Sequence, residues 1–465
     1  MTRRIAVRRY LAGTLRWFAH RILPQPASAA EPVPMAPWRA PDMPSWLAEE
    51  LRAQAQFDAG LLPDDDAIEK YAYYSIPCDE ETGRFYSEIL QQVDSRDYTH
   101  VFLVPWLKPG GADRGILHHL NAVIESVPQA NVLLISTEPA TSEWRDRVPA
   151  GVRFIETGLM PTKVDFRKQV VAISRLLVQL QPGVVHLVNS RAGWEAIRQH
   201  GLAITQYSRL YASLFCDDMN GAGRPVGYAR DYLRDTWHHF EKIFCDNSRY
   251  PKMWSRDLGV PAEAFSVLPF PYDGQVVERM PHEAGGEGAK LLWAGRFDRQ
   301  KRPDVLLQIA RRLPQFHFDV HGVSVLGPED EAISSIRALP NVTINGPFAR
   351  FGDIVDRNHL AYVMTTSWEG MPTILFDAAA NGLPIIAPPV GGIPDFVAYD
   401  QLVGDPDDVD GYVAQIERYA REPQRVVEIR SSQYTTLRTE RAWATFTRNL
   451  QNIPHYLDAH FGERR

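Results

Sequence analysis

Two carboxylates in the second half of the chain flank the start of a predicted helix. Glu369 lies in the turn SWEGMP, and Asp377 lies inside the following segment PTILFDAAANG. A helix N-terminus carries free N–H groups and a partial positive charge, so it would favour a phosphate group at the carboxyl end of the preceding strand. The alternative interpretation is that Glu369 is a solvated loop acid and Asp377 belongs to a solvated helix face.

The predicted helix has its own start and stop signals. Pro372 suits the first helical position because its missing N–H would have no partner there. Asn381 and Gly382 supply a left-handed stop. Thr373 shares a face with Asp377 because the two are four residues apart. The apolar runs AYVMTT before the helix and PIIAPPV after it predict buried strands.

Two cations follow another apolar run, KLLWAGR. Arg296 and Lys301 lie five residues apart in GRFDRQKRP. Arginine offers a planar fork for phosphate oxygens and lysine a compact charge, so the pair could bind a diphosphate at two points. With Arg299 and Arg302 alongside, the alternative is a solvated charged face.

A glycine pair follows the first predicted strand. Gly110 and Gly111 in PGGADRG would let backbone N–H groups approach an anion just before the helix ILHHLNAVIES. The alternative is that the two glycines only form a tight turn.

Motifs for several other chemistries do not occur in the sequence. It contains no GxxxxGK[ST], GxGxxG, HExxH, CxxC pair or GxSxG. Asp217 and Asp218 in FCDDMN could hold a metal, although paired loop acids more often cap turns. We therefore expect no metal ion and no cofactor.

The composition is that of an ordinary globular protein of more than one domain. The chain has 465 residues and a net charge of −7, which argues against a nucleic-acid partner. Its three cysteines are far apart, which favours reduced thiols and a cytoplasmic location. No apolar run reaches the ~18 to 20 residues that span a bilayer.

Short apolar strands alternate with helices in two successive regions, which predicts two doubly wound parallel sheets facing a cleft, an α/β fold. Strands are expected in THVFLVPWL, NVLLIST, VRFIET, GVVHLVN, RLYASLFC, KIFCD and FSVLPFP, and then in KLLWAGR, FHFDVHG, NVTING, AYVMTT, PIIAPPV and QLVG. The predicted segments are a basic segment 1–23, a Pro/Ala-rich linker 24–44, a helical extension 45–97, Rossmann-like domains 98–282 and 283–430, and C-terminal helices 431–465 that pack back on the first domain.

The first 23 residues carry six arginines and no acid. Apolar residues at helical spacing are typical of a helix at a membrane surface, but a basic tail without fixed structure is an open alternative. If this segment binds anionic lipid, we expect the protein at the inner face of the plasma membrane.

The motifs PGGADR, GRFDRQK, EGMPTILFDA and NGLPIIAPPVGG, in that order, resemble glycosyltransferase family 4, the retaining nucleotide-sugar enzymes of GT-B fold, over residues 98–430. The resemblance implies that Arg296 and Lys301 bind the diphosphate of the donor. The E-x7-E motif of the family falls on Glu369 and Asp377, implying contacts to the donor sugar and to the ribose. The remaining donor-site residues implied are Gly110, Gly111, Gly370, Met371, Pro372 and Thr373.

The sequence departs from the family pattern at three places. Asp377 stands where the family usually has Glu, so its reach is shorter by one methylene. The family's histidine after the fourth strand is replaced, so we expect Asn189 to line the site and His186 to be a core residue. The His-Asp after the fifth strand becomes Cys216 and Asp217, which leaves Asp217 as a candidate acceptor-site acid.

The resemblance implies a metal-independent transfer of a hexosyl group from a nucleoside diphosphate sugar to a saccharide or lipid-linked glycan. A helical extension ahead of such a domain is also similar to bacterial cell-surface polysaccharide enzymes. Two alternatives remain open. One is a nucleotide-sugar epimerase of the same fold, and the other is a non-catalytic binding partner of another transferase.

Overall fold

The structure is a computed structural model that describes residues 43, 45–62, 80–94, 97–274, 288–324 and 331–457. The predicted basic segment and most of the Pro/Ala-rich linker lie outside these ranges. The chain divides into two units, residues 1–79 and 80–465. In the first unit, helix α2 spans Ser45–Gln54 and a 3-10 turn η1 spans Ala59–Leu61. No helix of the described residues is long and apolar enough to cross a membrane.

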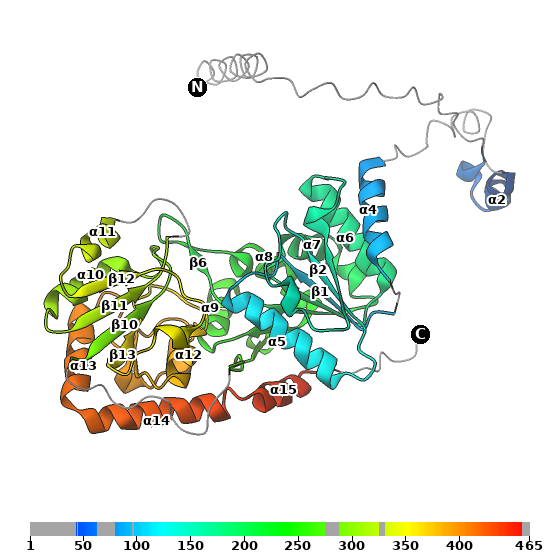
Figure 1. Cartoon of the computed structure of the whole chain (residues 1–465). Coiled ribbons are helices and arrows are strands. Elements are labelled where there is room, and N and C mark those ends of the chain that lie inside the picture. Colours follow the sequence, from blue (N-terminus) through cyan, green and yellow to red (C-terminus); the bar gives the residue numbers. More distant parts are fainter. Residues whose placement is uncertain are drawn as a thin grey trace, which may run out of the picture. The chain divides into compact units, whose positions relative to one another are not determined.

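A seven-stranded parallel sheet organises the first part of the second unit (Figure 1). Its strands run in the order β3-β2-β1-β4-β5-β8-β9. They are β1 His100–Val104, β2 Val132–Ser136, β3 Val152–Glu156, β4 Val184–Val188, β5 Arg209–Ser213, β8 Phe240–Cys245 and β9 Phe265–Val267. All seven overlap predicted strands. Three of them, β1, β2 and β4, are buried along their whole length, as strands covered on both faces are. We call the residues 80–274 around this sheet the first domain.

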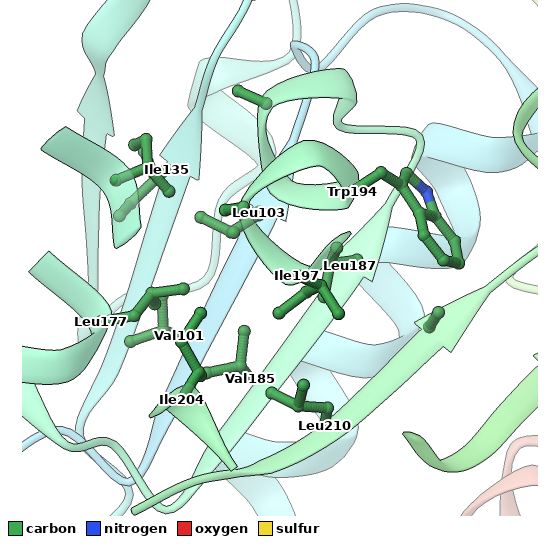
Figure 2. Close-up of a cluster of buried hydrophobic side chains, with 14 of the residues drawn as sticks. Val101, Leu103, Ile135, Leu177, Val185, Leu187, Trp194, Ile197, Ile204 and Leu210 are labelled. Atoms are coloured by element: carbon green, nitrogen blue, oxygen red, sulfur yellow. The ribbon is translucent and has the colours of Figure 1, made fainter. Parts of the chain in front are cut away.

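Helices cover both faces of the first sheet. They are α4 Glu80–Gln92, α5 Gly111–Ser126, α6 Phe166–Leu180, α7 Arg191–Ile204, α8 Tyr228–Thr236 and α9 Arg249–Leu258. On one face, buried side chains of the strands and of α6 and α7 form the core in Figure 2. The side chains of Asp165 and Ser190 cap the N-termini of α6 and α7. A two-stranded hairpin, β6 Asp218–Met219 and β7 Pro225–Val226, extends from this domain after β5.

A five-stranded parallel sheet forms the second domain, which we define as residues 288–439. Its order is β12-β11-β10-β13-β14. The strands are β10 Lys290–Ala294, β11 His317–His321, β12 Val342–Asn345, β13 His359–Val363 and β14 Ile385–Ile386, and the helices are α10 Pro303–Arg312, α11 Glu331–Arg337, α12 Ile374–Ala380, α13 Val409–Arg421 and α14 Pro423–Thr439. The two doubly wound sheets confirm the predicted fold class.

The prediction of a strand at QLVG is wrong. Only a single bridge joins Ala387 to Leu402 there. A 3-10 turn occupies Tyr399–Gln401 just before it, and the Gly404 N–H donates to Asp408 Oδ2 at 2.8 Å just after it. The segment therefore turns too soon to extend the sheet. That turn is η9, and the other 3-10 turns of the second unit are η3 Arg145–Arg147, η4 Thr157–Leu159, η5 Trp237–His239, η6 Ala262–Ala264, η7 Phe351–Ile354 and η8 Ile393–Asp395.

The last helix, α15 Trp443–Gln451, returns to the first domain and lies beside α5 (Figure 1). Phe446, Leu450 and Tyr456 share a buried core cluster with β1 and α5. The Tyr456 hydroxyl is 2.9 Å from His119 Nδ1 and 2.8 Å from His186 Nδ1. Burial lowers the pKa of His119 to about 3, so the imidazole is neutral at pH 7. His186 is fully buried in this cluster.

Candidate active site

A cavity of about 920 Å³ lies between the two domains, at the carboxyl ends of their strands. This size is within the range of small-molecule sites. Its walls come from both domains, so a ligand bound there would contact both. The lining residues are Pro105, Trp106, Gly111, Ala112, Asp113, Glu138, Asn189, Arg191, Leu214, Phe215, Cys216, Asp218, Gly227, Tyr228, Asp246, Ala294, Gly295, Arg296, Lys301, Glu369, Gly370, Met371, Pro372, Thr373 and Ile374.

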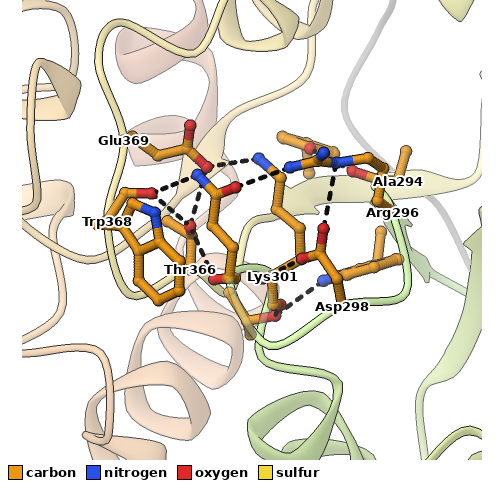
Figure 3. A network of polar contacts seen from close by, with 11 residues as sticks. Ala294, Arg296, Asp298, Lys301, Thr366, Trp368 and Glu369 are labelled. Atoms are coloured by element: carbon orange, nitrogen blue, oxygen red, sulfur yellow. Dashed lines mark hydrogen bonds and ion pairs between the residues drawn. The ribbon is translucent and has the colours of Figure 1, made fainter. Parts of the chain in front are cut away.

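Lys301 and Glu369 form an ion pair on the second-domain wall (Figure 3). The Lys301 ammonium contacts Glu369 Oε1, and the Thr366 hydroxyl donates to the same oxygen at 2.9 Å. The side chains of Lys301 and Glu369 are only 16% and 10% exposed. Burial makes each charge depend on the other, because an isolated buried charge is strongly unfavourable.

Arg296 lies on the same wall but in a more open position. Its side chain is 47% exposed, and it bonds to Asp298 Oδ2 at 3.2 Å and to Gln300 Oε1 at 2.7 Å. Gln300 in turn donates to the Trp368 carbonyl at 2.7 Å, next to Glu369. The two loops that carry the cations and the acid are therefore joined by hydrogen bonds (Figure 3).

Residues 369–373, which we call the 369–373 loop, all line the cavity. The prediction that Pro372 opens the helix is wrong, because α12 begins at Ile374. The carbonyls of Pro372 and Thr373 accept from Leu375 and Phe376, a spacing of three residues, so this part is a tight turn. Gly382, with φ +71°, supplies the left-handed stop.

The predicted glycine turn lies across the cavity from this loop. Gly111 is the first residue of α5 and lines the cavity, whereas Gly110 is outside the lining. A Cβ at Gly111 would be 3.9 Å from the Thr373 side chain. Asp113 accepts from the Lys108 N–H at 2.9 Å, and burial raises its pKa to about 6. The turn thus brings α5 close to the opposite wall.

Asp377, the second predicted acid, is absent from the cavity lining. Its carboxylate lies 3.9 Å from Arg114 Nη1 on α5, and Arg114 Nε is also 3.5 Å from Asp273. Burial raises the pKa of Asp377 to about 6, despite the opposing effect of the Arg114 charge. The structure therefore places Asp377 at the contact between the domains, one helical turn from the cavity.

Replacing Asp377 with asparagine is expected to stabilise the protein at neutral pH. The folded-state pKa of about 6 lies above the ordinary 3.8, so the folded state binds this proton more tightly and loses stability as pH rises from about 4 to 6. The variant cannot ionise, so at pH 7.5 its melting temperature should be higher than that of the wild type. The gain in the free energy of unfolding should be at most about 3 kcal/mol. The difference should vanish below pH 4.

Thermal melting across pH 3.5 to 8 measures this effect. Asp410→Asn, at an exposed ion pair with Arg312, is the matched control and should show no comparable pH-dependent gain. A lower melting temperature for Asp377→Asn at pH 7.5 would instead mean that the Arg114 pair is net stabilising.

Asn189 and Asp217, the two residues of the first domain predicted to lie near the sugar or the acceptor, have different positions. Asn189 lines the cavity, in a left-handed conformation with φ +54° at the end of β4. Asp217 does not reach the cavity. Its carboxylate is fully buried, with Arg230 Nη2 at 2.6 Å and Trp254 Nε1 at 2.8 Å. The neighbouring Asp218 lines the cavity in its place.

Several lining residues were missed by the sequence reasoning. Trp106, Glu138 and Asp246 each follow a strand of the first sheet, namely β1, β2 and β8. Carboxyl ends of parallel strands meet at one edge, so strand-end position was the signal that could have found them. Arg191 and Tyr228 open α7 and α8. Within the described residues, no group of three or more His, Cys, Asp and Glu side chains could hold a metal ion.

Solved structures similar to this chain are glycosyltransferases of GT-B architecture. The lipopolysaccharide outer core galactosyltransferase WaaB has a TM-score of 0.59 and 15% identity, covering 76% of this chain and 98% of that one. Anabaena Alr3699/HepE in complex with UDP has a TM-score of 0.57 and 15% identity, and the match covers 76% of this chain and 98% of that one. Sucrose-phosphate synthase from Thermosynechococcus elongatus also has a TM-score of 0.57 and 15% identity, and the match covers 76% of this chain and 97% of that one. At these identities the likeness shows the fold, and the chain has the GT-B fold.

Residues 288–422 match the family model described as Glycosyl transferases group 1. This range contains Arg296, Lys301, Glu369 and the 369–373 loop. Fold and family match together identify a glycosyltransferase. No curated protein sequence matches the chain.

Proposed function

We propose that this protein is a retaining, metal-independent glycosyltransferase that moves a hexosyl group from a nucleoside diphosphate sugar to a saccharide or lipid-linked glycan acceptor in polysaccharide biosynthesis. The observation that carries the proposal is the arrangement of Arg296, Lys301 and Glu369 on one wall of the interdomain cavity.

The two cations would stabilise the leaving diphosphate. Breaking the bond between sugar and diphosphate develops negative charge on the phosphate oxygens, and preorganised cations in a site with little water stabilise that charge most strongly. Arg296 and Lys301 are already held in place by Asp298, Gln300 and Glu369. Little reorganisation would therefore be needed when the donor binds.

Glu369 would orient the sugar of the donor. Its Oε1 accepts from Lys301 and Thr366, and the following backbone of the 369–373 loop lines the cavity. A donor whose diphosphate lies on Lys301 would therefore have its sugar near Glu369. Thr373 and Gly111 would approach the donor from the two sides.

Uridine diphosphate sugars are the first donors to test. Structures of HepE, which shares the fold, are in complex with UDP and with UDP-glucose. The first-domain wall would hold the acceptor, because Trp106 and Tyr228 offer aromatic faces and Glu138 and Asn189 offer polar groups. Such a mixture of flat apolar and polar groups suits a sugar ring.

A donor screen tests the proposal. The protein would be incubated with UDP-, GDP- and dTDP-sugars, with and without EDTA, and release of nucleoside diphosphate followed. We expect release from one class of donor that EDTA leaves unchanged. Release abolished by EDTA would contradict the metal-free mechanism. Conversion of the sugar without nucleotide release would indicate an epimerase, and no binding of any donor a non-catalytic partner.

We further propose that the basic residues 1–23 hold the enzyme at the cytoplasmic face of a membrane containing anionic lipid. Six arginines without an acid would each gain about 1 kcal/mol near such a surface. Deleting these residues should release the protein from vesicles containing phosphatidylglycerol in a sedimentation assay, and unchanged sedimentation would contradict this role.

A further inference from the structure

Three consecutive residues after β8 reach from the first domain to the second. Asp246 Oδ2 accepts from the Met371 N–H at 3.0 Å. Asn247 packs against Gly392, where an added Cβ would lie 2.8 Å from the Asn247 Cβ. Ser248 donates to Asp395 through its N–H at 2.6 Å and its hydroxyl at 2.7 Å. Of the three, Asp246 is the one that contacts the 369–373 loop.

The Asp246 carboxylate is held firmly from its own domain. It is 4% exposed, and its Oδ1 accepts from Asn247 Nδ2 at 2.7 Å. Asn247 is fixed in turn, since its Nδ2 also donates to the Phe215 carbonyl at 2.8 Å. Its Oδ1 accepts from the backbone of α9, including the Tyr250 N–H at 3.1 Å. The position of the carboxylate is thus set before it meets the second domain.

Both carboxylate oxygens of Asp246 are used, and both partners are donors. An asparagine would offer only one acceptor and would turn its NH₂ group toward the other donor. The buried guanidinium of Arg441, between α14 and α15, adds a favourable charge. Its Nε and Nη1 have no hydrogen-bond partner in the described part of the chain. Burial raises the pKa of Asp246 to about 6, against the lowering effects of the Met371 and Asn247 hydrogen bonds and the Arg441 charge, so most of the group is ionised at pH 7 and both oxygens can accept.

The 369–373 loop is shaped for this contact. Gly370 has no side chain, and a Cβ there would lie 3.2 Å from Asp246 Oδ2 and 3.2 Å from the Phe215 Cβ. On the other side, the Gly392 N–H donates to the Gly370 carbonyl at 2.7 Å. The backbone just after Glu369 is therefore held between a second-domain glycine and a first-domain carboxylate.

We propose that Asp246 is a positioning residue for sugar transfer, whose carboxylate fixes the 369–373 loop and so orients Glu369 when the two domains meet. This inference rests on the proposed function for its catalytic consequence. Asp246 acts through the Met371 backbone, whereas the cations at Arg296 and Lys301 are held by contacts within the second domain. Loss of Asp246 should therefore affect sugar transfer more than nucleotide binding.

Hydrogen exchange tests the contact without any ligand. In Asp246→Ala and Asp246→Asn, the Met371 amide should exchange roughly tenfold faster or more, because its partner is lost or weakened. The matched control is Ser248→Ala. It removes the hydroxyl bond to Asp395 of the second domain, two positions from Asp246, and should leave the exchange rate of the Met371 amide unchanged. Unchanged exchange in folded Asp246→Ala would overturn the inference, and Asp246→Asn decides it if the alanine variant does not fold.

The catalytic consequence is tested by comparing binding with turnover. In Asp246→Asn, the dissociation constant for UDP, measured by calorimetry, should change less than threefold, while UDP release from UDP-glucose should fall roughly tenfold or more. Equal losses in both would mean a general structural role and would overturn the inference. If the wild type releases no nucleotide from any sugar donor, the proposed function fails, while the exchange experiment still decides whether Asp246 fixes the loop.

Discussion

Lys301→Met is expected to reduce sugar transfer roughly 100-fold or more. The ammonium is more buried than the guanidinium of Arg296, the other second-domain cation that lines the cavity, and it is in contact with Glu369. Removing one preorganised group that stabilises developing charge typically costs two to three orders of magnitude in turnover. Binding of UDP should also weaken, because hydrogen bonds to charged groups contribute roughly 1.5 to 3 kcal/mol. Steady-state nucleotide release and calorimetry measure the two effects.

Lys290→Met is the matched control. Lys290 is the first residue of β10, the strand that precedes the loop of Lys301. It is also paired, with Asp319 at 3.3 Å and Asp356 at 3.1 Å, but it lies at the opposite edge of the sheet from the cavity. Its replacement should change turnover less than twofold. Because Lys301→Met leaves Glu369 buried without its cation, melting temperatures must accompany the kinetics. Comparable turnover losses in both variants would show that Lys301 has no special role.

Gly391→Ala is expected to abolish turnover by displacing Glu369. Gly391 has φ +52°, and an added Cβ would lie 1.9 Å from the Glu369 carbonyl oxygen and 2.8 Å from that of Gly370. The left-handed conformation alone costs an alanine roughly 1 to 2 kcal/mol. The clash is with backbone, so the 369–373 loop must move. We expect a lower melting temperature together with the loss of nucleotide release.

Gly259→Ala separates strain from displacement. Gly259 has φ +73° after α9, and no atom lies within 4 Å of an added Cβ. Gly259→Ala should therefore lose about as much stability as the backbone strain alone costs Gly391→Ala, and it should keep its turnover. If Gly391→Ala is destabilised to the same degree as Gly259→Ala and remains active, Gly391 does not determine the position of Glu369.

The fold was predictable because the central strands of its sheets are buried on both faces. Runs such as VFLV and LLIS need no long-range information to be recognised, and both sheets follow from their alternation with helices. QLVG resembles such a run in composition, but the neighbouring 3-10 turn and the cap at Asp408 take the chain elsewhere. Local pattern cannot show where a chain must turn to complete other hydrogen bonds.

Except for Asp377, the predicted site residues that belong to the second domain lie together on one wall of the cavity. Arg296, Lys301 and Glu369 meet in the cavity as neighbouring strand-end loops should. Positions that depend on the other domain were not predictable in the same way. Asp377 faces Arg114 across the domain contact, and Asp246 crosses it to reach Met371.

We expect the cavity wall that carries Lys301 and Glu369 to bind a sugar nucleotide. Hydrogen exchange of the whole protein, with and without UDP-glucose, measures this binding. Residues 295–301 and 369–374 should be protected, with no change at the opposite edge of the second sheet around Lys290 and His359. Binding of the sugar nucleotide, detected by calorimetry, without protection of either cavity segment would contradict this expectation.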